Sequence, residues 1–110
     1  MNVEHKENQT VIKDTHDNIV SFSEDLLNEL TDFKDQNLII DLTHNSNITS
    51  TSIKQFVQIS KLHKKNNKSF VIVANTIDYN SVPVSLTLVP TILEAHDIIN
   101  MEEIERDLGF

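Results

Sequence analysis

Short apolar runs alternate along the chain with longer segments of helical periodicity, and together they predict a small α/β domain. Residues 38–42 and 69–74 are apolar almost throughout, which is typical of parallel strands buried on both faces. Two briefer strands are predicted at 10–13 and at 87–90, where Pro90 ends the second. We therefore expect a small mixed or mostly parallel sheet of about four strands with helices packed on it.

Three segments have apolar residues at helical spacing. The first follows Asp17, which can cap a helix, and its apolar positions are Ile19, Phe22, Leu26, Leu30 and Phe33. A second helix is predicted from about residue 50 to 63. A third runs from about 92 to 107, where Thr91 and Glu94 form a Thr-x-x-Glu capping box. One short helical turn can also follow Pro83.

The two ends of the chain lead to separate predictions. Residues 1–9 are polar and charged, and we expect a flexible lead-in before a single domain over residues 10–110. In the last helix, Ile98, Met101, Ile104 and Leu108 form a second apolar set beside Ile92, Ala95 and Ile99. We expect one helix that stays packed on the sheet; the alternative is that residues 101–110 leave the domain and offer an acidic, apolar-faced helix to a partner.

Composition narrows the classes of function. The chain has no Cys, which excludes thiolate zinc sites and cysteine nucleophiles. Its net charge of -8 argues against nucleic acid as a partner, and a single glycine, Gly109, argues against the glycine-rich loops that hold nucleotide phosphates. No apolar run approaches the roughly 20 residues of a membrane span. We expect a cytoplasmic protein without a cofactor.

The candidate chemistry is sparse. No two histidines are three or four residues apart, the spacing of a helical metal pair, so we predict neither a metal site nor catalytic residues, and the protein is interpreted as non-enzymatic. His44 is interpreted as an exposed turn residue. Asp41 ends an otherwise apolar strand, and a buried carboxylate needs hydrogen bonds. We expect Asp41 to accept backbone N–H groups from the turn that follows it.

From Leu38 onward the chain resembles the STAS domain of anti-sigma-factor antagonists and sulfate-transporter tails. Asp41-Leu42-Thr43 and the run from Thr49 to Ile53 match the Asp-Leu-Ser strand and the Asp-Ser-Ser-Gly-Leu turn of that family, except that Thr49 replaces the turn aspartate and Ser52 the glycine. The resemblance implies a protein-interaction module. It places the residue that a partner kinase phosphorylates at Ser50.

Two roles for Ser50 stay open, a helix cap or a phosphorylated switch. The partner-binding surface is predicted on the turn and the helix after it, at Thr49, Thr51, Ser52, Lys54 and Lys61. The expected partner is a protein that is kinase-like, anti-sigma-like or ribonuclease-associated. The alternative is a small ligand or lipid held between sheet and helices, as in some STAS-like proteins.

A second resemblance concerns residues 89–91 and the ending from Met101 to Phe110. Both look like a small family in Bacteroidetes that is often labelled ribonuclease Z. That enzyme requires a His-x-His-x-Asp-His cluster for two zinc ions, whereas this chain has only scattered histidines. We therefore interpret this resemblance as pointing to an association with a ribonuclease.

Overall fold

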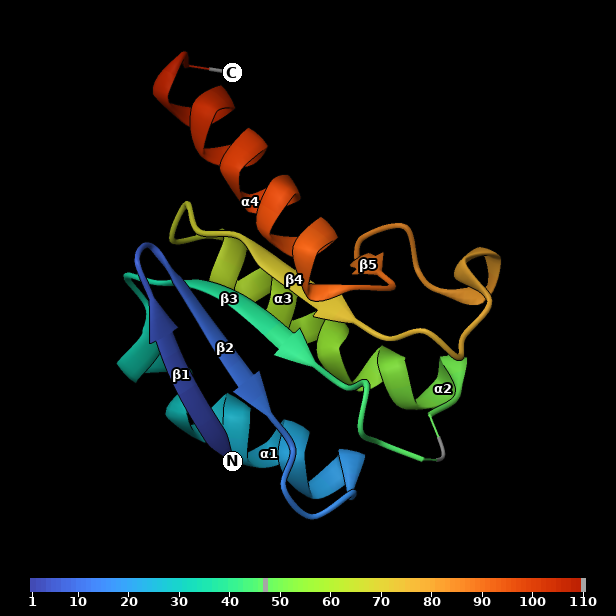
Figure 1. The fold of residues 1–110 in the computed structure, drawn as a ribbon. Helices are drawn as coiled ribbons and strands as arrows, with labels where there is room; N and C mark the ends of the chain where they lie inside the picture. The colour runs from blue at the N-terminus through green and yellow to red at the C-terminus, as the bar shows by residue number, and fades with distance from the viewer. Residues whose placement is uncertain (47, 110) are drawn as a thin grey trace.

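The computed structural model describes residues 1–46 and 48–109, and its five-stranded sheet has helices on both faces (Figure 1). In chain order the elements are β1 (Asn2–Lys6), β2 (Gln9–Lys13), α1 (Ile19–Glu29), η1 (Leu30–Phe33), β3 (Asn37–Asp41), α2 (Ser50–Ile53), η2 (Lys54–Phe56), α3 (Val57–Lys64), β4 (Phe70–Val73), η3 (Tyr79–Ser81), β5 (Thr87–Val89) and α4 (Ile92–Asp107).

The strands lie in the sheet in the order in which they occur in the sequence. β1 is antiparallel to β2, and every other neighbouring pair is parallel. All residues of the central strands β3 and β4 are buried, as their continuous apolar sequence predicted. The α/β class and the mostly parallel sheet are therefore confirmed, with β1 as an additional strand.

Alternate residues of each strand supply the two cores. Leu38, Ile40 and Ile72 belong to the core under α1 and α3, where Phe22 and Phe56 meet edge to face with ring centroids 6.1 Å apart. Ile39, Val71 and Val73 belong to the second core, which Ala95 and Ile99 of α4 cover. A single helix on this second face leaves the β1 side of the sheet less covered (Figure 1).

The structure corrects the expectation of a flexible lead-in at residues 1–9. Residues 2–6 form β1, which pairs with β2 across a two-residue turn, with Lys6 opposite Gln9 and Glu7 at a φ of 55°. Polar composition concealed the strand because β1 is an edge strand whose side chains are mostly exposed. The turn also lacks the glycine that usually signals a hairpin.

Three helix boundaries differ from the prediction. Asn18, and not Asp17, caps α1, since its side chain accepts the N–H of Ser21 at 3.1 Å. The predicted helix over 50–63 is divided into α2, η2 and α3 by a 3₁₀ segment. The short helical turn η3 comes before Pro83, and a single hydrogen-bonded turn follows Pro83, in which the Leu86 N–H donates to the Pro83 carbonyl at 3.0 Å.

The end of α4 also differs from what we expected. Ala95 and Ile99 are buried, but Met101, Ile104 and Leu108 are 61%, 58% and 67% exposed. In Figure 1 the last turns of α4 extend past the edge of the sheet. Met101, Ile104 and Leu108 therefore face solvent, whereas Ile98, the remaining member of the second apolar set, packs against the second core.

Candidate functional site

The loops that follow β2, β3, β4 and β5 gather at one edge of the sheet, because the carboxyl ends of parallel strands point the same way (Figure 1). In open α/β sheets this edge commonly carries the functional residues. The candidate site is here, in the turn between β3 and α2. Asn47 of this turn lies outside the described residues.

Asp41 begins the turn. Its side chain is only 4% exposed, and its Oδ1 accepts the backbone N–H of Thr43 at 3.0 Å and the Thr43 hydroxyl at 2.7 Å. Lys13 Nζ lies 4.0 Å from Oδ2. These partners compensate for burying the carboxylate, and they direct the chain away from the strand end.

Two acidic residues of the loop after β2 hold the middle of the turn. Asp14 Oδ2 accepts Asn45 Nδ2 at 2.9 Å, and Asp17 accepts both the backbone N–H of Ser46, at 3.0 Å, and the Ser46 hydroxyl. The side-chain hydrogen bond from Ser46, followed by its backbone N–H, lowers the pKa of Asp17. The two loops therefore form one connected surface.

The sequence analysis did not identify this role of Asp14 and Asp17. Their positions carried a usable signal, because the polar run from Asp14 to Asn18 directly follows a strand that is parallel to β3. Loops that leave neighbouring parallel strands emerge at the same edge. Which acidic oxygen meets which donor depends on three-dimensional geometry.

The helix after the turn starts one residue earlier than a Ser50 cap would require. Thr49 is the cap: its Oγ1 accepts the N–H of Ser52 at 3.1 Å, and Ser50 is the first helical residue. Of the two roles left open for Ser50, the helix cap is therefore wrong. Thr49 and Thr51 are exposed, whereas Ser50 and Ser52 are half-buried.

The two basic residues of the predicted surface lie beyond the turn. Lys54 is on η2 and Lys61 on α3, and both are exposed. Seven residues separate them, or about two turns along a nearly continuous helical path. The predicted residues thus form a band that leads from the hydroxyl-bearing turn along the outside of the helix.

A shallow hollow lies on the face of the sheet that α4 covers, beside the start of that helix. Its volume is about 430 Å³, within the size range of small-ligand pockets. Val11 and Ile92 give it an apolar part, and Lys6, Lys13, Glu4 and Asp41 supply charges of both signs. Across residues 1–46 and 48–109, no cluster of three or more His, Asp or Glu side chains could hold a metal ion.

A STAS-like α/β fold is the class that this architecture defines, and the comparisons with solved structures agree. A serine-to-glutamate variant of RsbS from Moorella thermoacetica superimposes with a TM-score of 0.65, at 14% identity over 91% of this chain and 94% of that one. A chain from the stressosome, described as a signal integration and transduction hub, gives a TM-score of 0.62, at 17% identity over 91% of this chain and 96% of its own.

No protein-family model and no curated protein matches the sequence. At these low identities the structural likeness establishes the fold. Within the described part of the chain, no helix has the length and apolar character needed to cross a bilayer.

Proposed function

We propose that this protein is a non-enzymatic regulatory module that binds another protein through the band from Thr49 to Lys61, and that phosphorylation of Ser50 switches this binding. The observation that carries the proposal is the clamped turn: Asp41, Asp14 and Asp17 accept hydrogen bonds from Thr43, Asn45 and Ser46, and so hold the stretch of chain that leads toward the hydroxyl-rich residues 49–52. A preordered surface loses less conformational entropy when it binds a partner. The neighbours with the same fold, RsbS and the stressosome chain, add support.

The geometry favours Ser50 over Thr49 as the modified residue. The Thr49 hydroxyl accepts the N–H of Ser52, so a phosphate on that oxygen would disturb the helix cap. Ser50 is not the cap, and a phosphate there would add about two negative charges beside Lys54 while leaving the cap in place. The charge of the docking surface around Ser50 would therefore change from positive to negative while α2 stays folded.

The experiment is an affinity purification of the tagged protein from its native cell, scored by mass spectrometry for partners and for phosphate on residues 49–52. We expect a stoichiometric protein partner. The Ser50→Asp variant should weaken its binding about tenfold or more, equivalent to about 1.4 kcal/mol. Ser85→Asp, which changes an exposed serine in the loop before β5, is the matched control and should bind like the wild type.

Two results would contradict the proposal. Recovery of no partner would remove the docking function, and equal binding by Ser50→Asp and wild type would remove the switch. Recovery of a ribonuclease would give the second sequence resemblance a physical basis, as an association rather than an activity of this chain.

A second candidate function is small-ligand or lipid binding in the hollow beside α4. The apolar contribution of Val11 and Ile92 next to charged side chains of both signs favours an amphiphile with a zwitterionic head group. A thermal-shift screen with short-chain fatty acids and lysophospholipids tests it, because a ligand at 100 times its Kd stabilises the fold by about 2.7 kcal/mol. Lys13→Gln should reduce any such shift.

A further inference from the structure

Several large apolar residues lie on the exposed side of α4 among acidic ones, while its inward side near the C-terminal end is polar, which is unusual for a surface helix. Leu93, Met101, Ile104 and Leu108 are all more than half exposed. We call Met101, Ile104 and Leu108 the α4 stripe. Helical spacing places these three on one side over a length of about 10 Å.

A polar network fixes the direction of the α4 stripe. On the inward side, the Glu103 carboxylate accepts Nδ2 of both Asn37 and Asn8, the latter at 2.7 Å. Arg106 donates to the Ser69 hydroxyl at 3.2 Å and to Asn37 Oδ1 at 3.3 Å. Because these bonds join α4 to β3 and to the residue before β4, the helix cannot rotate to bury the stripe without breaking them.

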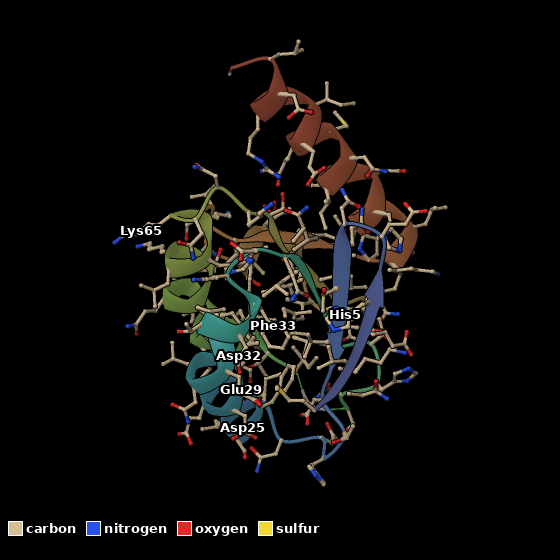
Figure 2. All side chains as sticks on the ribbon, turned by 90° about the vertical axis from the view of Figure 1, so that its left-hand side faces the viewer. His5, Asp25, Glu29, Asp32, Phe33 and Lys65 are labelled. Carbon is tan, nitrogen blue, oxygen red and sulfur yellow. The ribbon has the colours of Figure 1, made fainter. Side chains whose placement is uncertain are left out.

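The opposite layer of the molecule contains a groove of matching character. Leu27 and Leu62, 39% and 38% exposed, form apolar walls between α1 and α3. The groove has a volume of about 440 Å³, and its other lining residues are Leu30, Thr31, Lys34, Lys65 and Asn66. Figure 2 shows Lys65 reaching outward from this layer.

Charge distinguishes the two surfaces. Glu94, Asp97, Glu105 and Asp107 border the exposed side of α4, as helical spacing requires. The lining of the groove contains two lysines and no acidic residue. The acidic side chains labelled on α1 and η1 in Figure 2, Asp25, Glu29 and Asp32, do not belong to that lining.

We propose that a second copy of this chain is the partner of the α4 stripe, which inserts into the α1–α3 groove of that copy. A ridge with an acidic border then meets an apolar groove bordered by lysines, a complementary pairing. One chain cannot make this contact with itself, because α4 and the α1–α3 layer lie on opposite faces of the sheet (Figure 1). The contact is head-to-tail and leaves a free stripe and a free groove at the ends of each assembly.

Sedimentation velocity over about 10–500 μM protein tests the proposal, at about 0.15 M salt so that the net negative charge is screened beyond roughly 8 Å. We expect the average mass to rise with concentration past that of a dimer. Ile104→Glu should abolish the rise, and Leu62→Glu with Lys65→Glu should do the same. Val84→Glu, at a fully exposed position before β5, is the control and should associate like the wild type.

The decisive experiment mixes the stripe variant, Ile104→Glu, with the groove variant, which combines Leu62→Glu and Lys65→Glu. Each should be monomeric alone, but the intact groove of Ile104→Glu can receive the intact stripe of the groove variant, so the mixture should form dimers and stop there. A far-UV circular dichroism melt of each variant checks that it is folded.

Three outcomes would overturn the proposal. They are a wild type that is monomeric throughout, a folded Ile104→Glu variant that still associates, and a folded groove variant that still dimerises, which would indicate stripe-to-stripe contact. The test is independent of the Ser50 switch, since neither surface includes the turn between β3 and α2.

Discussion

Replacing Asn37 with Ala should destabilise the fold far more than the loss of an ordinary polar side chain. Asn37 is the first residue of β3 and is 1% exposed. Its Nδ2 donates to the Asn8 carbonyl at 3.1 Å and to Glu103, and its Oδ1 accepts the Ser69 N–H at 2.9 Å as well as Arg106. One side chain therefore joins the β1–β2 turn, β3, the start of β4 and α4.

The size of the loss in unfolding free energy depends on which hydrogen-bond partners of Asn37 can bind water once its side chain is removed. The Ser69 N–H lies in a residue that is 1% exposed, and leaving such a donor unpaired costs about 1–3 kcal/mol. Glu103 and Arg106 are about one-third exposed and can be rehydrated, so losing their bonds to Asn37 adds only about 1 kcal/mol. The total is about 2–4 kcal/mol, or roughly 8–16 °C in Tm.

Urea unfolding followed by far-UV circular dichroism measures the effect, because the chain has no Trp and a single Tyr. Asn75→Ala, at an exposed loop position, is the control and should change the unfolding free energy by less than about 0.5 kcal/mol. A loss below about 1 kcal/mol for Asn37→Ala would refute the reasoning. It would mean that the Ser69 N–H finds another partner once Asn37 is removed.

Four further predictions concern single residues. Thr49→Ala should cost about 1 kcal/mol in urea unfolding through loss of the α2 cap, and Thr49→Ser should restore most of it. Leu26→Ala, at a fully buried position, should cost about 2–5 kcal/mol in the same assay. Burial lowers the pKa of His63 below 6.5. Because the folded state favours the neutral imidazole, the free energy of unfolding should decrease as pH falls from about 6.5. Wild type should therefore lose more stability than His63→Gln between about pH 7 and 5. The hydrogen bond from Asn37 lowers the pKa of Glu103 below 4.5, so wild type should lose more stability than Glu103→Gln between about pH 5 and 3; equal losses in either pair would contradict the corresponding assignment.

Local patterns were reliable wherever one local interaction dominates. The apolar runs of β3 and β4 identified buried parallel strands, since burial on both faces favours apolar residues along the strand; the polar residues of β3, Asn37 and Asp41, stand at its two ends. Thr91 was identified as a helix start, and its hydroxyl accepts the N–H of Glu94 at 3.2 Å. Capping depends on residues only three apart, but neighbouring polar residues compete for the cap position, so the sequence located the starts of α1 and α2 only to within one residue.

Local patterns failed where contacts with a segment distant in the sequence determine the structure. β1 is polar because it lies at the edge of the sheet, and only its pairing with β2 makes it a strand. The apolar residues of α4 divide according to which side of the helix faces the sheet, which buries Ile99 and leaves Ile104 exposed. Helical periodicity separated the two sets, but only the tertiary structure showed which side of α4 faces the sheet.

The α/β class, the central strands, the position of α4 and the hydroxyl-rich turn after Asp41 could all be predicted from the sequence. The tertiary structure alone decided that Asp14 and Asp17 hold that turn, that Asn37 joins four segments, and that the α4 stripe points outward. The difference lies in how far apart in the sequence the contacting residues are. Secondary structure follows from contacts among near neighbours in the chain, whereas a surface is made by segments whose separation in sequence says little about their separation in space.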